Sequence, residues 1–378
     1  MIIRGGKVFS VRKEQEKGRA LRKGYFKEKD LFINAGRRFA DKADDGDQEV
    51  FDASGCYVIP GLVDVHTHGC AGCDFSDADP EGLKRIAAWE FSQGVTAFCP
   101  TSMTLPVDRL AEICASAGSI PDDGRHALAA GIHLEGPFVS MEKMGAQNPD
   151  YILSPDPGTF EKLQAAAAIP IRLITIAPEL PGAIEFIDRF HNQVHISLGH
   201  TAGTYEDASR AYDHGADHAT HLYNAMTPYA HREPGIIGAA AERPNVFVEL
   251  ICDGLHIHPS AIRATFAMFG ADRVVLISDS MRAAGLPDGE SELGGQTVYK
   301  KGLRATLKDG RLAASVSSLM DCMRNVVRFG IPLEDAVLAA TDNPARSIGL
   351  GGQIGCIEAG ARGSVVILDR DLNPVQVF

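Results

Sequence analysis

The sequence has no long apolar run and no surplus of positive charge. No stretch approaches the ~20 apolar residues that a membrane-spanning helix needs, and the N-terminal segment turns charged almost at once, unlike a signal peptide. With 37 Lys and Arg against 49 Asp and Glu, the formal charge of -12 disfavours nucleic acid and anionic membranes as partners. A small anionic substrate stays open, because a local basic clamp can outweigh a diffuse negative field. We expect a cytoplasmic protein that acts on a small molecule.

The eight cysteines give neither a disulfide framework nor a zinc signature. Most lie inside apolar runs, as reduced core cysteines do. Cys70 and Cys73 form a C-x2-C motif. Because no second such pair accompanies it, we interpret these two residues as structural.

What the sequence does have, from about residue 57, is a regular alternation of strand-like and helix-like segments. Eight short β-branched runs are nearly all followed by a stretch of helical period, which predicts a (β/α)8 TIM-like barrel over residues 57–345. A doubly wound open sheet is the alternative, but it normally uses fewer units. The eight runs are YVIPGLVDVH, GVTAFCPTS, LAAGIHLEGPF, IRLITIAPE, QVHISLGH, DHATHLYN, NVFVELICDG and RVVLISDS.

The two ends of the chain differ from this pattern. Residues 1–56 and 346–378 contain short strand-like segments joined by turns, so we expect them to combine into one small β-sandwich domain beside the barrel. Residues 11–30 are dense in charge and predict a solvated loop or short helix without an assigned function. Residues 299–315 predict a hairpin with a Lys-Asp-Gly turn.

Six side chains that can ligate a metal fall at the ends of five predicted strands. In a barrel of this kind the catalytic residues lie at the C-terminal strand ends. His66 and His68 are two residues apart on one strand, so they project to the same face. A lone histidine is more often a core or surface group, but the coincidence of all six with one barrel mouth favours a metal centre. The six are His66, His68, Glu135, His200, His221 and Asp279.

The mixture of imidazole and carboxylate suits divalent zinc or iron. Four histidines and two carboxylates exceed the needs of one ion, so we predict two ions bridged by Glu135. Some barrel hydrolases bridge with a carbamylated lysine on the fourth strand, but IRLITIAPE contains no lysine. Asp279 suits a ligand that also carries a proton between water and the leaving group.

Several motifs together resemble the N-acetylglucosamine-6-phosphate deacetylases of the amidohydrolase superfamily. They run in order from about residue 57 to residue 345, and the flanks are similar to the small β domain of that family. HLEGPF followed by THLYNAM and HREPG is quite specific, whereas His-x-His alone indicates only the superfamily. The motifs are PGLVDVHTHG, HLEGPF, SLGHT, THLYNAM, HREPG, CDGLH and SDSM.

The resemblance implies roles position by position. Glu135, His200 and His221 match metal ligands found throughout the family, and His66 with His68 matches a pair present only in members with a second metal. Asp279 matches the catalytic aspartate. The resemblance also implies a homodimer, whose neighbouring subunit can supply the arginine that grips the substrate phosphate. Substrate-binding positions are Asn224, Ala225, Arg232 and His256, with Gln147 able to hydrogen-bond the substrate.

The chain departs from the family after EGPF. Where paired lysines and a histidine are common, this chain has Met144 and Gln147, and a glutamine cannot act as an acid. From the residues alone, Arg232 could instead form a surface ion pair with Glu233. The HIH at 256–258 repeats the His-x-His spacing, but its place on a loop favours substrate contact over a third metal.

We therefore expect metal-dependent deacetylation of N-acetyl-D-glucosamine 6-phosphate, giving acetate and glucosamine 6-phosphate. Alternatives are the galactosamine epimer as substrate, or another amidohydrolase such as a cyclic-amide hydrolase or purine deaminase. A non-enzymatic relative that keeps the barrel as a binding module would be expected to lose ligands, and here all six are present.

Overall fold

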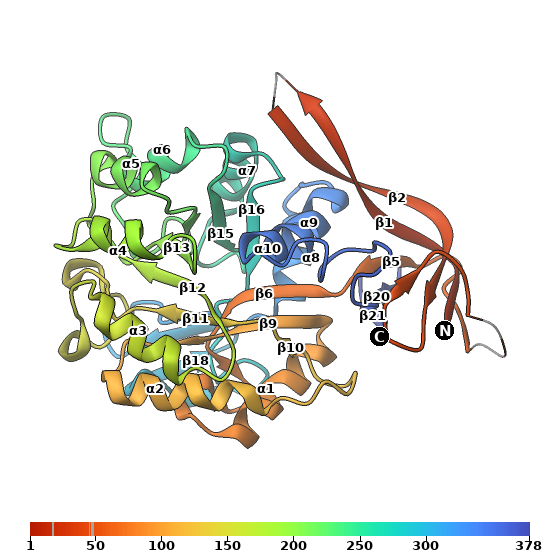
Figure 1. The fold of residues 1–378 in the computed structure, drawn as a ribbon, viewed down its shortest axis with the longest axis horizontal. Coiled ribbons are helices and arrows are strands. Elements are labelled where there is room, and N and C mark those ends of the chain that lie inside the picture. The colour runs from red at the N-terminus through yellow and green to blue at the C-terminus, as the bar shows by residue number, and fades with distance from the viewer. Residues whose placement is uncertain (17–18, 45, 47–48) are drawn as a thin grey trace.

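The computed structural model describes residues 1–16, 19–44, 46 and 49–378 and contains a parallel β-barrel ringed by helices (Figure 1). Neighbouring strands of the barrel are all parallel, and they follow one another around it in chain order. This confirms the barrel and excludes the open doubly wound sheet. The strands are β6 (Leu62–Thr67), β9 (Val95–Ser102), β11 (Ile132–Glu135), β12 (Ile171–Ile176), β13 (His195–Leu198), β14 (His218–Ala219), β15 (Phe247–Ile251) and β16 (Val274–Ile277).

The barrel is joined between its first and last strands just beyond the end of β16. The backbone N–H of Asp279 donates to the carbonyl of His66 at 2.9 Å, and that of His68 donates to the carbonyl of Ser280 at 2.8 Å. These two bonds place the residues after β16 directly beside the end of β6. The first and last barrel segments of the chain therefore meet at the mouth.

Helices follow the strands as the alternation predicted, and their first turns are capped by short polar side chains. Asp79, Asp156, Thr204 and Ser318 each accept a hydrogen bond from a backbone N–H of the helix that follows, which satisfies donors that the helix itself leaves unpaired. The helices are α1 (Pro80–Ser92), α2 (Val107–Ser116), α3 (Pro157–Ala166), α4 (Ala183–Phe190), α5 (Tyr205–Asp213), α6 (Gly235–Ala241), α7 (Pro259–Phe269), α8 (Leu319–Arg328), α9 (Leu333–Ala340) and α10 (Asp342–Ser347).

Short elements decorate the connections. The Cys70–Cys73 motif forms a two-residue hairpin at the barrel mouth, and both thiols are free and buried. No helix in the described part of the chain has the length and apolar character needed to cross a bilayer. The short elements are β7 (Gly69–Cys70), β8 (Cys73–Asp74), β10 (Leu128–Ala129), η1 (Phe75–Asp77), η2 (Ala117–Ser119), η3 (Met141–Lys143) and η4 (Pro149–Tyr151).

Both ends of the chain contribute to a second, mixed sheet of seven strands beside the barrel, shown in red and dark blue in Figure 1. Its inward face buries an apolar cluster of its own, separate from the barrel core. The predicted fold class is therefore confirmed, while the division into residues 1–56 with 346–378 and residues 57–345 remains our proposal. The strands are β1 (Ile2–Glu16), β2 (Arg19–Ile33), β3 (Phe39–Ala40), β4 (Val50–Asp52), β5 (Tyr57–Pro60), β20 (Val365–Leu368) and β21 (Pro374–Val377).

The loop or short helix predicted for residues 11–30 is wrong wherever the structure describes this segment; residues 17–18 lie outside the described part. The segment belongs to β1 and β2, which pair antiparallel as a long hairpin arm. Its charged residues are tolerated because they pair along and across the strands: Glu14 lies 2.7 Å from Arg12 and 3.1 Å from Lys23. High charge density therefore indicates solvation here, and solvation is compatible with a two-stranded arm.

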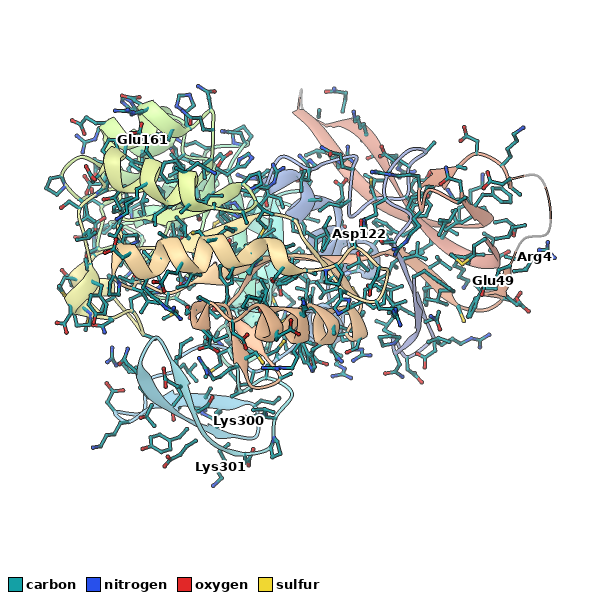
Figure 2. The ribbon with its side chains drawn as sticks, turned by 60° about the horizontal axis from the view of Figure 1, so that its bottom comes forward. Arg4, Glu49, Asp122, Glu161, Lys300 and Lys301 are labelled. Carbon is teal, nitrogen blue, oxygen red and sulfur yellow. The ribbon has the colours of Figure 1, made fainter. Side chains whose placement is uncertain are left out.

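A three-stranded antiparallel sheet is inserted after β16 and projects from the barrel, with Lys300 and Lys301 on it in Figure 2. The predicted hairpin is present with its turn at Lys308 to Gly310, where the chain reverses so that Leu312 bridges to Thr306. A further turn, at residues 302–303, joins the last two strands of the sheet. The strands are β17 (Gly289–Leu293), β18 (Gln296–Lys301) and β19 (Arg304–Leu307).

Candidate metal centre

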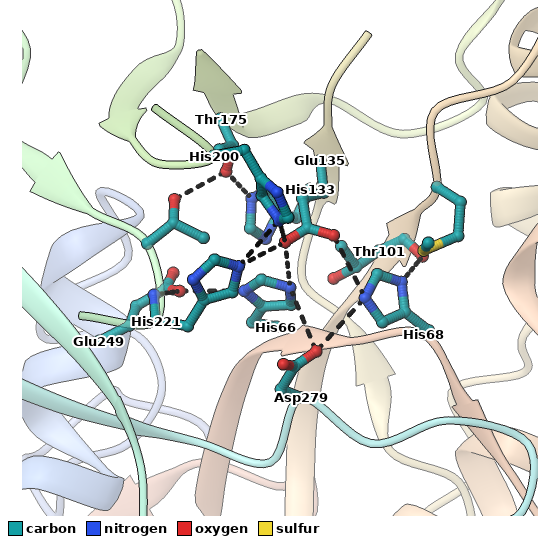
Figure 3. A network of polar contacts seen from close by, with 12 residues as sticks. His66, His68, Thr101, His133, Glu135, Thr175, His200, His221, Glu249 and Asp279 are labelled. Carbon is teal, nitrogen blue, oxygen red and sulfur yellow. Dashed lines mark hydrogen bonds and ion pairs between the residues drawn. The ribbon is translucent and has the colours of Figure 1, made fainter. Parts of the chain in front are cut away.

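The six side chains predicted to ligate metal lie together at the mouth of the barrel (Figure 3). Three of them, His200, His221 and Asp279, have backbone φ angles of 47°, 26° and 46°, in the left-handed region that non-glycine residues rarely adopt. Such conformations cost about 1–3 kcal/mol each and persist where the surroundings hold them. The strand ends are thus bent so that these side chains turn toward a common centre.

Glu135, the last residue of β11, occupies that centre. Its Oε1 lies 3.3 Å from Nε2 of His66, 3.1 Å from Nε2 of His200 and 2.9 Å from Nε2 of His221. Its Oε2 lies 3.4 Å from Nε2 of His68. One carboxylate therefore touches all four histidines, as the predicted bridging role requires.

Asp279 closes the other side of the cluster. Its Oδ1 lies 3.3 Å from Nε2 of His68 and 3.6 Å from Nε2 of His66. The carboxylate is buried, yet this oxygen has no hydrogen-bond partner, and neither has Nε2 of His66. Unpaired buried polar atoms are costly, so two facing one centre point to a missing partner there.

The remaining ring nitrogens explain what kind of partner fits. Three histidines direct Nδ1 away from the centre toward an oxygen, so Nδ1 carries the proton and the Nε2 lone pair faces inward. A pocket lined by lone pairs and two carboxylates suits a divalent cation. The outward pairs are His66 Nδ1 with Glu249 Oε2 at 2.9 Å, His68 Nδ1 with the Thr101 carbonyl at 3.1 Å, and His200 Nδ1 with the Lys143 carbonyl at 2.9 Å.

The electrostatics indicate the same requirement for positive charge. Burial would raise the pKa of Glu135, but the neighbouring His66 and His200 outweigh it and hold that pKa well below its usual range. Burial would lower the pKa of His68, yet the adjacent carboxylates of Asp279 and Glu135 raise it to about 10. The buried carboxylates thus draw positive charge into the site.

The donor atoms form two overlapping groups that share Glu135. His66, His68 and Glu135 make one, and Glu135, His200 and His221 make the other; within each group the ligand atoms lie within 4.8 Å of one another. Residues that can hold metal are therefore present twice, side by side. A third group of the same kind, His66 with His133 and Glu249, lies deeper in the barrel.

A cavity of about 300 Å³ opens above the cluster. Four of the five predicted substrate-binding positions line it: Gln147, Asn224, Ala225 and His256. Arg232 does not line it; this residue is exposed on the loop between β14 and α6. The structure thus brings together every predicted site residue except the arginine.

Gln147 is buried and spans two elements. Its Oε1 accepts the backbone N–H of Thr104 at 2.7 Å, which fixes the amide orientation, and its Nε2 donates to Oε2 of Glu135 at 2.6 Å. The Gln147 side chain therefore contacts the central carboxylate as well as the cavity.

His256 is held by an acidic partner three residues earlier. Its Nδ1 lies 2.7 Å from Oδ2 of Asp253. Burial would lower the pKa of His256, but the hydrogen bond and charge of Asp253 outweigh burial and raise it. A cationic His256 suits contact with an anionic group of a ligand.

Sequence reasoning missed several residues of the site. Lys143 and Arg311 bring cationic side chains to the cavity wall from loops that carried no recognisable motif. Glu249 and His133 lie below the cluster, and a signal for each was available. A lone glutamate inside the apolar run FVELI, and a histidine two residues before Glu135, both point into the barrel interior.

Comparison with known proteins agrees with this geometry. The Amidohydrolase family matches residues 57–378, so the chain belongs to that family of barrel enzymes. N-acetylglucosamine-6-phosphate deacetylase of Lysinibacillus sphaericus is 36% identical over 326 residues, covering 85% of this chain and 84% of that protein. The predicted resemblance to these deacetylases is thereby confirmed.

Two further relatives bear on the substrate. N-acetylgalactosamine-6-phosphate deacetylase of Escherichia coli O157:H7 is 35% identical over 324 residues, covering 85% of this chain and 86% of that protein. A mutant N-acetyl-D-glucosamine-6-phosphate deacetylase from Mycobacterium smegmatis, solved in complex with N-acetyl-D-glucosamine-6-phosphate, has a TM-score of 0.85 and 31% identity, covering 100% of this chain and 97% of that one. Proteins similar to this chain therefore include deacetylases named for each of the two sugar epimers, N-acetylglucosamine 6-phosphate and N-acetylgalactosamine 6-phosphate.

Proposed function

We propose that the protein hydrolyses the acetamide of N-acetyl-D-glucosamine 6-phosphate, releasing acetate and D-glucosamine 6-phosphate. The observation that carries this proposal is the convergence of four histidines on Glu135, with Asp279 beside them, beneath a cavity of sugar size. The deacetylase relatives, similar over most of the chain, supply the reaction class.

Two divalent ions, zinc or iron, are part of the proposal because two ligand groups share Glu135. Ions held there would act as Lewis acids, polarising the acetamide carbonyl and making a water molecule more acidic. His66 and His68 would hold one ion, His200 and His221 the other, and Asp279 would complete the first group.

Asp279 is the proton carrier in this scheme. Its buried Oδ1 faces the cluster and has no competing hydrogen bond, so it can accept a proton from the attacking water and pass it to the departing amine. Glu135 is surrounded on all sides by histidines and the Gln147 amide, so it is poorly placed to exchange protons with a substrate.

The phosphate would lie toward His256 and the Asn224–Ala225 backbone. Because Arg232 is exposed and lies outside the cavity of its own chain, we assign it to the cavity of a second subunit, which makes the protein a homodimer. Lys143 and Arg311 add positive charge to the cavity of the same chain. A phosphorylated metabolite as substrate also fits a cytoplasmic location.

Turnover of N-acetylglucosamine 6-phosphate, measured together with the metal content of the same sample, tests the proposal. We expect acetate release by protein that carries about two ions, and loss of activity after chelation with recovery on adding zinc or iron. Unphosphorylated N-acetylglucosamine should be a poor substrate. Hydrolysis of a hydantoin or deamination of adenine, without acetate release from the sugar phosphate, would assign the site to a different amidohydrolase reaction.

The galactosamine epimer is the second candidate substrate, because the relative from Escherichia coli O157:H7 acts on it and is about as similar as the glucosamine enzyme. Comparing kcat/KM for the two 6-phosphates under the same conditions decides between them. A higher value for N-acetylgalactosamine 6-phosphate would reverse our assignment while keeping the reaction.

A further inference from the structure

Glu249 is a charged residue in the middle of an otherwise apolar barrel strand. It lies on β15 in the segment FVELI and has no exposed surface. Removing a carboxylate from water is costly unless it is paired and hydrogen-bonded. Its partners therefore explain why the sequence places it there.

Those partners are two of the candidate metal ligands. Oε2 of Glu249 lies 2.9 Å from Nδ1 of His66 and accepts the backbone N–H of His221 at 3.1 Å. Oε1 lies 3.5 Å from Nε2 of His218, also fully buried. A single oxygen thus contacts a side chain at the end of β6 and the backbone after β14 (Figure 3).

The two contacted ligands belong to different groups. His66 is in the group with His68, while His221 is in the group with His200. Glu135 joins these groups from within the centre, and Glu249 joins them from the barrel interior below. Because Glu249 fixes the His66 ring with its proton on Nδ1, it directs the Nε2 lone pair to the centre.

We propose that Glu249 is a positioning residue that holds both ligand groups of the metal centre in one arrangement and increases the basicity of His66. This inference rests on the proposed function for the identity of the site.

A third ion at His66, His133 and Glu249 would be the other explanation of this cluster. Both nitrogens of His133 are already engaged: Nδ1 lies 3.1 Å from the Val65 carbonyl and Nε2 lies 2.8 Å from Oγ1 of Thr175. A histidine in that state has no free lone pair for a metal, so the positioning role is favoured.

Glu249→Gln is the informative variant because it keeps the shape. The amide oxygen can occupy the shared acceptor position, and its NH2 would then face His218, whose ring nitrogens lack partners. The variant should therefore fold, losing only the negative charge. Glu249→Leu removes the acceptor as well. Glu90→Gln is the matched control, since Glu90 is a fully buried glutamate that interacts with Asp64 and Thr67 rather than with a candidate ligand side chain.

Metal-free proteins are titrated with zinc in competition with a chromophoric chelator, and thermal unfolding is followed with and without zinc. For Glu249→Gln we expect zinc affinity to fall about 10–100-fold at both sites, the usual effect of losing such an orienting partner. Glu249→Leu should lose more, and Glu90→Gln should bind as the wild type does. The metal-free midpoint of Glu249→Gln should match the wild type while its stabilisation by zinc shrinks.

In kinetics, Glu249→Gln should lower kcat with little change in KM, because Glu249 does not line the cavity. Wild-type zinc affinity in Glu249→Gln would overturn the inference. A stoichiometry of three zinc ions in the wild type and two in Glu249→Gln would also overturn it, because Glu249 would then be a ligand of a third ion. If zinc binding responds as expected but the wild type hydrolyses neither sugar phosphate, the proposed function fails and the positioning role stands.

Discussion

At the scale of single residues, the surroundings of Asp279 favour a role in proton transfer. It sits in the left-handed backbone region directly after β16, with a buried, unpaired Oδ1 facing His66 and His68. Few other groups in the cavity can move a proton, because the histidines are engaged with Glu135 or with outward acceptors. The Asp279 carboxylate can therefore carry a proton, which the side-chain amide of an asparagine at this position could not do.

We predict that Asp279→Asn keeps metal but loses turnover by roughly 10²–10⁴-fold, the range for removing a general acid–base group. Metal analysis and acetate release on one preparation check this. The asparagine retains an oxygen ligand at the same place, so metal content should stay near that of the wild type. Turnover within a few-fold of wild type would contradict the proton-carrier role.

The candidate ligands could be found from the sequence because barrel geometry gathers strand ends at one mouth. Glu249 was missed for the opposite reason: it lies inside a strand, where the prediction expected only apolar packing. Gln147 was expected to contact the substrate, and its contact with Glu135 depends on the path of the 141–147 loop. Arg232 carried a motif, but its motif says nothing about which chain's cavity it serves.

At the scale of elements, the inserted sheet β17–β19 supports the loop that frames the candidate metal centre. Nε2 of Gln296 on β18 donates to the Ala146 carbonyl at 2.6 Å, and Arg311 reaches the Gly145 carbonyl at 3.4 Å. The same loop supplies the Gln147 amide to Glu135 and the Lys143 carbonyl to His200. The insertion is thus linked to two ligands through one loop.

We predict that Gln296→Ala lowers kcat/KM by about 5- to 10-fold, the effect of losing one net hydrogen bond of about 1 kcal/mol. Lys301→Ala, on the same strand but outside this contact, is the control and should leave kcat/KM unchanged. Steady-state kinetics of the two variants decides the point. Equal values for both variants would show that the loop holds its position without the sheet.

Helix α1 carries another buried glutamate, Glu90, whose pKa is affected by Asp64 on β6. Burial first, and the charge of Asp64 second, raise the pKa of Glu90 well above its usual range. In the unfolded chain Glu90 ionises near pH 4.3. Above that pH the unfolded state loses a proton that the folded state keeps, so this residue reduces stability as pH rises.

Glu90→Gln should remove that pH dependence. We predict that the free energy of unfolding of the variant, relative to wild type, is larger at roughly pH 6.5 than at roughly pH 5.5, by up to about 1.4 kcal/mol. Denaturant unfolding of both metal-free proteins at the two pH values measures it. A difference that stays constant with pH would mean that Glu90 is ionised in the folded protein.

At the scale of the whole molecule, the long β1–β2 arm makes a buried ion pair with the barrel domain as well as apolar contacts. Arg22 donates Nε and Nη2 to the two carboxylate oxygens of Asp342, each at 2.7 Å. The Asp342 side chain is 1% exposed, whereas that of Arg22 is 18% exposed. The pair therefore stabilises the contact between the two parts mainly by satisfying a buried charge.

We predict that Arg22→Ala lowers the free energy of unfolding by about 3 kcal/mol, the lower end for breaking a buried pair, because Arg346 stays 3.8 Å from Asp342. Lys23→Ala, which breaks only the partly exposed pair with Glu14, should cost less than about 1 kcal/mol. Denaturant unfolding compares the two. Equal losses would show that the arm is held by its apolar contacts alone.

The barrel could be predicted because few folds are compatible with regular strand–helix alternation. The structure of the charged β1–β2 arm could not be predicted from the sequence. Charge patterning reports that a segment is solvated, and a two-stranded arm exposed on both faces satisfies this as well as a loop does. The apolar residues Val11, Leu21 and Tyr25 are too few among the charged residues to distinguish a strand from a solvated loop.

The backbone hydrogen bonds between the end of β6 and the segment after β16 can form only late in synthesis of the chain. His66 and His68 leave the ribosome more than two hundred residues before Asp279, and the hydrogen bond that joins these segments needs both. A growing chain can form the segment with His66 and His68 early, but Asp279 is the last of the six candidate ligands to be synthesised. If metal binds there as proposed, a chain that ends before Asp279 should hold it less tightly than the full chain.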